Sequence, residues 1–156
     1  MNSSLKEGKA APAFSAATQD GSIVSLKDLK GKSVVLYFYP RDDTPGCTKE
    51  ACEFRDTWKK ILKTGAVLLG VSPDSAKSHG KFAKKFKLPF PLLADEEKKI
   101  VKAYGVWGEK KFMGRAYMGV FRTTFLIGPD GKIQKIWTQV KPEGHAAEVL
   151  SVLGGK

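Results

Sequence analysis

Apolar and polar residues follow one another along this chain in blocks that predict strands separated by helices. The blocks at 34–39 and 66–71 are apolar throughout, which predicts two strands covered on both faces. Turn residues at 19–22 and 128–131, each with an Asp-Gly step, predict two hairpins. Shorter apolar blocks predict the remaining strands, at 14–18, 23–26, 121–127 and 132–138, with a short edge strand within 88–93, where prolines limit pairing.

Apolar residues that recur at helical spacing predict the helices between these strands. The expected helices are at 46–63, 72–87, 95–104 and 142–153, with a short helical turn at 28–31. The face of the first helix that we expect to be buried consists of Cys47, Ala51, Phe54, Trp58, Ile61 and Leu62.

Two segments show neither pattern. Residues 1–12 are expected to form a loose arm, and residues 105–120 a glycine-punctuated loop. A structureless loop of that length is often functional. We interpret its aromatic residues, Trp107, Phe112 and Tyr117, as loop-packing side chains.

The order of these elements predicts an α/β fold with a mixed central sheet flanked by helices on both faces. Two parallel strand–helix units come first, then an antiparallel hairpin and a closing helix. This is the layout of a thioredoxin-like fold with an N-terminal β-hairpin extension. With 156 residues and 42% hydrophobic content, we expect a single domain over residues 1–156.

Composition and charge narrow the possible partners and cellular location of the protein. The net charge is +11, but the lysines are spread along the chain, and those at 77–87 fit the solvated face of a helix. No basic stretch alternates with aromatic residues, so we expect no nucleic-acid partner. The sequence has no apolar stretch long enough to span a bilayer, which predicts no membrane partner, and no apolar secretory signal. Two cysteines are too few for a disulfide scaffold, so we expect a cytoplasmic protein with a working thiol pair.

Both cysteines lie in the stretch 37–52, where a predicted strand gives way to a predicted helix. Thr44 and Pro45 are typical of the cap and first turn of a helix, which places Cys47 in that first turn. Free backbone N–H groups and the helix dipole favour an anion at this position. Cys47 is therefore a candidate thiolate.

The spacing between Cys47 and Cys52 restricts the chemistry of the pair. A structural zinc site needs four ligands, and the two histidines of the chain, His79 and His145, are scattered and are interpreted as surface residues. The spacing is also too long for a Cys-x-x-Cys reductase. Five helical residues separate two Cα atoms by roughly 8–9 Å, whereas a disulfide tolerates at most about 7 Å. The two thiols therefore cannot bond while the helix is intact, and two inert buried thiols remain an alternative.

The pattern Pro40-x-x-x-Thr44-x-x-Cys47 resembles the active-site motif of the peroxiredoxins. The longer run 37–56 is similar to the bacterioferritin comigratory protein, or peroxiredoxin Q, subfamily. The resemblance covers nearly the whole chain and includes the segments 70–74, 88–93, 103–108 and 122–127.

This resemblance implies a peroxidase that reduces hydrogen peroxide and organic hydroperoxides. It implies that Cys47 is the peroxidatic cysteine and that Cys52 is the resolving cysteine, joined to it in an intrachain disulfide. It also assigns Pro40, Thr44 and Arg122 to the active-site pocket. Thioredoxin or a glutaredoxin-type dithiol is the expected reductant, with no cofactor and no metal, and we expect a monomer.

Plainer interpretations of the same residues stay open at this point. Thr44 could be only a helix cap, Pro40 only a strand terminator, and Arg122 a surface strand residue. At the level of function, the alternatives are a thiol–disulfide oxidoreductase of the same fold and a basic binding module whose thiols sense redox state.

Overall fold

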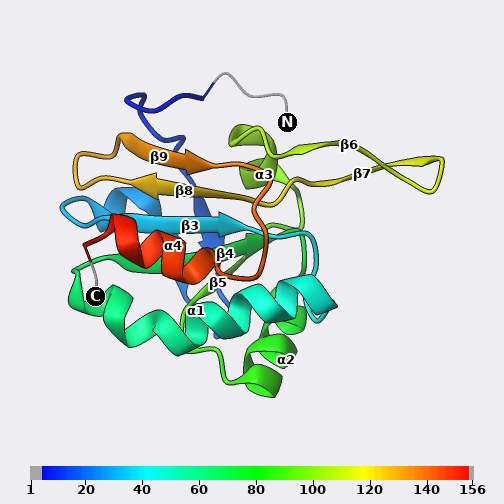
Figure 1. Ribbon diagram of the computed structural model, residues 1–156, viewed down its shortest axis with the longest axis horizontal. Helices are drawn as coiled ribbons and strands as arrows, with labels where there is room; N and C mark the ends of the chain where they lie inside the picture. Colours follow the sequence, from blue (N-terminus) through cyan, green and yellow to red (C-terminus); the bar gives the residue numbers. More distant parts are fainter. Residues whose placement is uncertain (1–4, 155–156) are drawn as a thin grey trace.

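The computed structural model describes residues 5–154 and is built around a five-stranded sheet in the order β5-β4-β3-β8-β9 (Figure 1). Strand β3 pairs in parallel with β4, and β4 with β5, whereas β8 pairs antiparallel with both β3 and β9. This arrangement confirms the predicted mixed sheet. The strands are β3 (Val34–Phe38), β4 (Val67–Ser72), β5 (Leu92–Ala94), β8 (Thr123–Ile127) and β9 (Ile133–Trp137).

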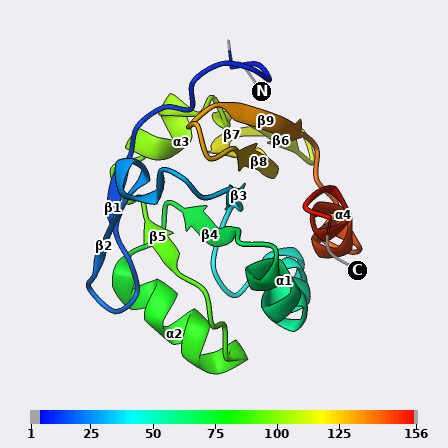
Figure 2. The same cartoon turned by 90° about the vertical axis from the view of Figure 1, so that its left-hand side faces the viewer.

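The central strand β3 is buried on both faces because its alternate side chains enter two separate cores. Val35 and Tyr37 pack in one core, and Leu36 and Phe38 in the other. The first core is covered by α1 (Pro45–Lys63), α2 (Ala76–Phe86) and α4 (His145–Val152). The second core is covered by α3 (Lys99–Ala103) and the N-terminal segment, so the two layers enclose the sheet (Figure 2).

The N-terminal hairpin and the segment before it are held against the body of the protein. Strands β1 (Ser15–Ala17) and β2 (Ile23–Ser25) form the predicted hairpin, and a short 3₁₀ helix, η1 (Leu26–Leu29), follows. The expected loose arm is wrong for residues 5–12, because Gly8 donates a hydrogen bond to the Ile133 carbonyl and Ile133 donates one to the Lys9 carbonyl. Residues 1–4 of that arm lie outside the described residues.

Three helices begin later than the sequence predicts. Helix α2 starts at Ala76, because the Ser75 side chain caps it by accepting a hydrogen bond from the N–H group of Ser78. Helix α3 starts at Lys99 because Lys98 has a left-handed backbone (φ 62°), and the Asp95 side chain accepts hydrogen bonds from the N–H groups of Ile100 and Val101. Asp95 therefore caps α3 from outside it. Helix α4 starts at His145 because Gly144 is also left-handed, with φ 83°.

The largest difference from the sequence prediction is at residues 105–120, which are not a loop. Strands β6 (Trp107–Phe112) and β7 (Arg115–Val120) form an antiparallel ribbon that projects from the body of the molecule (Figure 1). The ribbon turns at Met113 and Gly114, which both have positive φ angles, 50° and 78°. Such two-residue turns usually carry Asn-Gly, so a Met-Gly step is a weak sequence signal for a hairpin.

Helix α1 is the element that positions the cysteines. It begins after Thr44, whose backbone is extended, and Gly65 follows its end with a left-handed conformation (φ 88°). Most of the predicted inner face is buried, but Leu62 is 42% exposed. Glu50, which was not predicted to be on that face, is buried. Within the described residues, no helix is long and apolar enough to cross a bilayer.

Candidate active site

Cys47 lies just beyond the end of β3, in the first turn of α1, where the sequence predicts it. Its side chain is buried, with 2% exposure. Pro45 opens the helix, so the free N–H groups of the first turn lie around the sulfur position. Thr44 is at the N-cap position, but its hydroxyl donates to the Arg41 carbonyl (2.9 Å) and accepts no hydrogen bond from the helix.

Arg122 is distant from Cys47 in the sequence but contacts it in the fold. In the sheet, Thr123 pairs with Phe38, so the residue before Thr123 lies beside the point where β3 leads into the α1 loop. From there, the Arg122 Nη2 donates to the Cys47 Sγ at 3.4 Å. The side chain of Arg122 is only 16% exposed, so its interpretation as a surface strand residue is wrong.

Glu50 completes this cluster and was not singled out by the sequence. Arg122 Nη1 donates to Glu50 Oε1 at 2.6 Å, while the other oxygen, Oε2, is buried with no hydrogen-bond partner among the described residues. The signal for Glu50 was its spacing: three residues after Cys47 on a helix, it lies on the same face. The guanidinium of Arg122 thus bridges a thiol and a carboxylate.

Burial determines the charge states in this cluster. Removal from water raises the pKa of Glu50 to about 7, although the charge and hydrogen bond of Arg122 act in the opposite direction. Burial alone would lower the pKa of Arg122, but Glu50 and Cys47 raise it above its usual value. Arg122 is therefore a fixed cation beside the sulfur.

Gly46 leaves room for this cation. A Cβ atom at Gly46 would lie 3.2 Å from Arg122 Nη2 and 3.5 Å from Cγ of Pro142. Any side chain here would therefore press on the guanidinium that contacts Cys47. Gly46 and Pro142 also line an open depression over the start of α1.

The loop that leads from β3 into α1 is held by a buried hydrogen-bond network. The Asp42 carboxylate accepts hydrogen bonds from Tyr39 (2.6 Å) and Ser78 (2.7 Å) and lies 2.7 Å from Nδ1 of His79. The Asp42 backbone N–H donates to Asp74 (2.8 Å), which ties the loop to the end of β4. Pro40 lies in this loop directly after Tyr39 and is partly buried. The network fixes the approach to Cys47.

Both histidines are buried, so their interpretation as surface residues is wrong. His79 shares the inner face of α2 with Phe82 and Ala83, a spacing visible in the sequence. Its second nitrogen, Nε2, lies 2.9 Å from the Leu93 carbonyl. His145 begins α4 and lies 2.8 Å from the hydroxyl of Thr124.

Among the described residues, one group has potential metal ligands close enough together to share an ion. It consists of Asp42, Asp74 and His79, whose ligand atoms lie within 4.8 Å of one another. His79 Nδ1 already lies within hydrogen-bond distance of the Asp42 carboxylate, which also accepts from the Ser78 hydroxyl. The Asp74 carboxylate accepts from the Asp42 backbone N–H and the Ser72 hydroxyl. The group therefore acts as a structural network in this state of the protein.

Cys52 lies on the same unbroken helix as Cys47. Both thiols are free, and Cys52 is partly buried. This agrees with the predicted separation, which is too long for a disulfide across an intact helix.

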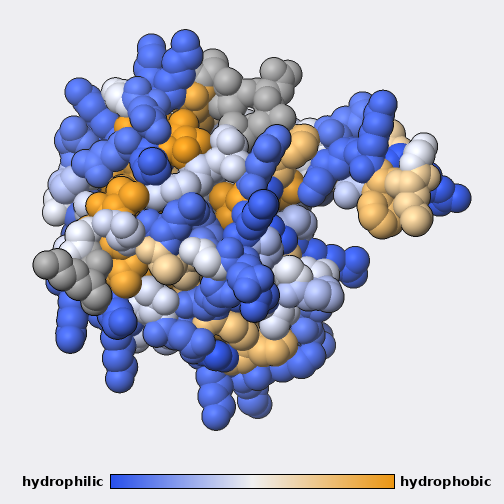
Figure 3. Space-filling view, viewed as in Figure 1, coloured by the Kyte–Doolittle hydropathy of each residue, from blue (hydrophilic) through white to orange (hydrophobic). Residues whose placement is uncertain are grey.

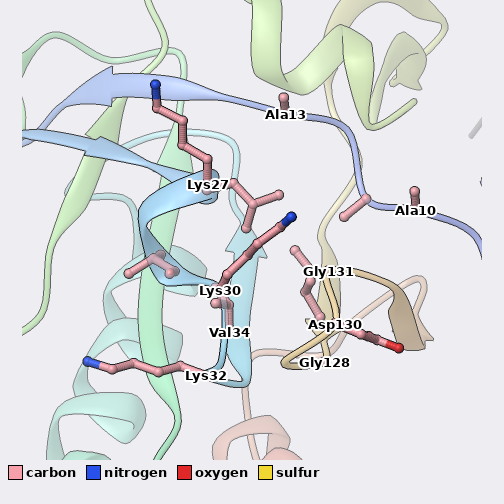
Figure 4. A pocket seen from close by; sticks show the side chains of 13 residues that line it. Ala10, Ala13, Lys27, Lys30, Lys32, Val34, Gly128, Asp130 and Gly131 are labelled. Atoms are coloured by element: carbon pink, nitrogen blue, oxygen red, sulfur yellow. The ribbon is translucent and has the colours of Figure 1, made fainter.

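A cavity of about 280 Å³ lies at the other end of the sheet and does not belong to this cluster. It is bounded by the start of β3 at Val34, the Gly128–Gly131 turn and the Lys27–Lys32 segment (Figure 4). Cys47 follows the opposite end of β3, so the sheet separates the two places.

Comparisons with known proteins identify the class of this site. The sequence matches the AhpC/TSA family over residues 8–136. A putative peroxiredoxin bcp of Coxiella burnetii is 51% identical over 150 residues, which are 96% of this chain and 99% of the relative. Peroxiredoxin Bcp of Bacillus subtilis is 49% identical over 149 residues, which are 96% of this chain and 95% of that protein.

Solved structures agree. A mutant of peroxiredoxin Q from Xylella fastidiosa matches with a TM-score of 0.93 and 37% identity, covering 98% of both chains. Peroxiredoxin Q of Xanthomonas campestris matches with a TM-score of 0.89 and 38% identity, covering 95% of this chain and 96% of that one. The chain therefore belongs to the AhpC/TSA family. Within it, the chain lies with the Bcp and peroxiredoxin Q proteins, which confirms the resemblance and the thioredoxin-like fold predicted from the sequence.

The raised pKa of Glu50 predicts how stability depends on pH. The folded protein holds the Glu50 proton up to about pH 7, whereas the unfolded chain loses it near pH 4.5. Stability from this group is therefore fully present below pH 4.5 and is lost as pH rises to about 7. The loss is at most roughly 3 kcal/mol. Glu50→Gln cannot ionise, so its unfolding free energy should fall less over that range than that of the wild type.

Urea unfolding of the reduced proteins across this pH range measures the difference. Glu97→Gln is the matched control, because Glu97 is 76% exposed and its loss should leave the pH dependence unchanged. Parallel curves for wild type and Glu50→Gln would show that Glu50 keeps an ordinary titration in the folded state.

Proposed function

We propose that this chain is a thiol-dependent peroxidase that reduces hydrogen peroxide and organic hydroperoxides at Cys47. The observation that carries the proposal is the contact of Arg122 Nη2 with the Cys47 Sγ, which places a fixed cation beside a thiol at a helix N-terminus. The family supports the same reaction, and a solved structure of the Xanthomonas campestris bacterioferritin comigratory protein is described as giving insight into alkyl peroxide reduction.

In the proposed reaction, the Cys47 thiolate attacks one oxygen of the hydroperoxide. The new S–O bond forms as the O–O bond breaks, and the leaving oxygen takes a proton to become water or an alcohol. Cys47 is then a sulfenic acid. The Cys52 thiol attacks its sulfur, which gives an intrachain disulfide and releases the sulfenic oxygen as water. A dithiol reductant supplies two electrons and two protons to restore both thiols.

Ionisation of the thiol alone does not account for a fast peroxidase. An ordinary thiol with a pKa of about 8.5 is about 3% ionised at pH 7. Complete ionisation would therefore accelerate attack by at most roughly 30-fold, or about 2 kcal/mol. The remaining acceleration must come from donors that stabilise charge on the peroxide oxygens as the bond breaks.

The side chains around Cys47 can supply those donors. Arg122 has a planar fork of N–H groups, one of which already contacts the sulfur, so another can hold a peroxide oxygen. Glu50 holds that fork in place. The Thr44 hydroxyl, now bonded to the Arg41 carbonyl, can rotate toward the substrate, and Pro40 limits the access of water.

The proposal also covers the reductant, the oligomeric state and the cellular location. We propose that thioredoxin or a glutaredoxin-type dithiol reduces the disulfide, and that the chain works as a single-domain monomer in the cytoplasm. The exposed face over the start of α1, at Pro45 and Lys49, offers a reductant access once the helix opens.

A coupled assay tests the proposed function. Hydrogen peroxide and an organic hydroperoxide are each supplied with thioredoxin, thioredoxin reductase and NADPH, and NADPH consumption is recorded. Peroxide-dependent consumption is expected with both substrates. Disulfide exchange with thioredoxin but no loss of peroxide would instead indicate a thiol–disulfide oxidoreductase.

Oxidation should unwind the start of α1. Cys47 and Cys52 are free on an intact helix, and their predicted separation of roughly 8–9 Å exceeds the reach of a disulfide. Phe54 and Ile61 are fully buried and should hold the rest of the helix. We therefore expect amide hydrogen exchange to increase on oxidation over about residues 44–54, while β3 and β4 remain protected.

Mass spectrometry of the same samples verifies the disulfide. Equal protection of residues 46–53 in the reduced and disulfide forms would contradict the unwinding. The Cys52→Ser variant is the control, because it cannot form the intrachain disulfide and should keep the start of α1 protected after peroxide treatment.

A further inference from the structure

The projecting β6–β7 ribbon carries an unusual share of the exposed apolar surface. Seven large apolar side chains are exposed in the described part of the chain, and four of them lie within residues 112–118. Those four are Phe112 (67% exposed), Met113 (89%), Tyr117 (47%) and Met118 (54%). Figure 3 shows hydrophobic residues gathered at the end of the ribbon and bordered by hydrophilic ones. A cluster of this kind marks an interaction site.

The ribbon that carries this apolar surface gains no stability from pairing with the central sheet. It forms a separate two-stranded sheet and adds no strand to the central five. Two strands alone are marginally stable in water. Met113 occupies a left-handed turn position that usually takes asparagine or glycine, so a large apolar side chain stands at the most exposed point of the turn.

The apolar side chains surround the tip of the ribbon. The strand register pairs Lys110 with Tyr117 and Phe112 with Arg115, which places Tyr117 and Phe112 on one face. Met118 pairs with Glu109 and lies on the opposite face, while Met113 is at the turn itself. A protein partner would cover one face. Apolar groups on both faces and at the turn instead suit a medium into which the tip inserts.

The charges around the tip indicate the kind of medium. Lys111 and Arg115 flank the apolar residues, Lys110 lies one pair further along the ribbon, and Glu109 is the only acidic side chain of β6 and β7. The whole chain carries a net charge of +11. Apolar and aromatic side chains bordered by basic ones are typical of segments that bind an anionic bilayer surface.

We propose that the tip of the β6–β7 ribbon, residues 110–118, docks the protein on the surface of an anionic lipid bilayer. Phe112 and Met113 insert among the headgroups and the adjacent acyl chains, while Lys111 and Arg115 contact anionic headgroups. The expectation of no membrane partner rested on the absence of a spanning segment, and surface docking needs none.

Docking of this kind would orient the active site. The base of the ribbon is fixed to the body, because Val120 is buried in the second core and the next residue, Phe121, donates a backbone hydrogen bond to the Val106 carbonyl (2.7 Å). Phe121 in turn leads directly to Arg122. At about 3.3 Å per residue, the strand from Arg115 to Val120 would hold the active site roughly 17 Å from the tip. The proposal concerns binding and stands whether or not the proposed peroxidase function holds.

Vesicle binding tests the proposal. The reduced protein is sedimented with vesicles of phosphatidylcholine alone, and with vesicles that also contain phosphatidylglycerol, at low and high salt. Binding is expected only to the anionic vesicles and should weaken with salt. The variant Phe112→Ser with Met113→Asn should bind at least about tenfold more weakly. Asparagine suits the left-handed turn, so this variant keeps the ribbon's turn geometry.

Two further variants sharpen the test. Lys111→Glu with Arg115→Glu should abolish binding to anionic vesicles. Ile23→Ser is the matched control, because Ile23 is 64% exposed on β2 and its loss should leave binding unchanged. Hydrogen peroxide turnover should be the same in all variants, which separates lost docking from lost activity.

Three outcomes would overturn the proposal. The first is no binding of the wild type to anionic vesicles, and the second is binding that survives the Phe112→Ser, Met113→Asn change. The third is an effect of that change on self-association or on KM for the dithiol reductant while vesicle binding is unaltered, which would assign the tip to a protein partner.

Discussion

Cys47→Ser is expected to abolish peroxide turnover, whereas Cys52→Ser should complete one turnover and then stop. Cys47 lies in the first turn of α1 with Arg122 at 3.4 Å, so it is the thiol with donors around it. Cys52 lies further along the helix, where the N–H groups are bonded within the helix. Rapid mixing with one equivalent of peroxide, followed by steady-state turnover with reductant, distinguishes the two variants.

Mass spectrometry identifies which sulfur reacts first. In Cys52→Ser, one equivalent of peroxide should add about one oxygen mass to Cys47, as expected for a sulfenic acid. Alkylation of the thiols before peroxide treatment is the control and should prevent the addition of oxygen. Oxygen found first on Cys52 in the Cys47→Ser variant, at the wild-type rate, would reverse the two assignments.

The central fold was predictable because its hydrophobic pattern has few alternatives. Strand β3 is apolar at every position, and only a strand between two layers can bury both of its faces. The glycines and prolines around it mark turns, so the order of strands and helices follows. The helix boundaries were less predictable. The starts of α3 and α4 are set by the left-handed backbone of Lys98 and Gly144, which composition does not reveal.

The β6–β7 ribbon could not be predicted from local signals. Its glycines suggest a loop, its turn is Met-Gly, and its side chains lack a regular alternation of apolar and polar residues. What forms it is pairing along the full register from Trp107–Val120 to Phe112–Arg115. That pairing depends on how side chains pack across the two strands, which the composition of either strand alone does not reveal.

The candidate site was predictable in part. The position of Cys47 follows from the helix cap and the proline before it, and the resemblance to the family points to Arg122. The buried position of Glu50 was missed because a glutamate on a helix is usually exposed. Its burial becomes understandable only with Arg122, the residue before β8, because the guanidinium donates a hydrogen bond to the buried carboxyl group.

Arg122→Ala is expected to slow the peroxide reaction by roughly 30- to 1,000-fold, or about 2–4 kcal/mol of transition-state stabilisation. The guanidinium contacts the Cys47 sulfur and is held by Glu50 at 2.6 Å, so it is positioned before the substrate arrives. The loss should persist at pH values above the ordinary thiol pKa, because charge stabilisation contributes more than the supply of thiolate. Stopped-flow measurement of the first turnover across pH gives the rate.

Three comparisons make the Arg122 result interpretable. Lys81→Ala removes an exposed positive charge on α2 and should leave the rate unchanged, which excludes a general effect of net charge. Arg122→Lys keeps the charge without the fork and should recover only part of the rate. Arg122→Ala leaves Glu50 buried without its cation, so the double variant with Glu50→Gln separates lost folding from lost catalysis. If raising the pH restored the full rate of Arg122→Ala, the role of Arg122 would be to ionise the thiol and not to stabilise the breaking O–O bond.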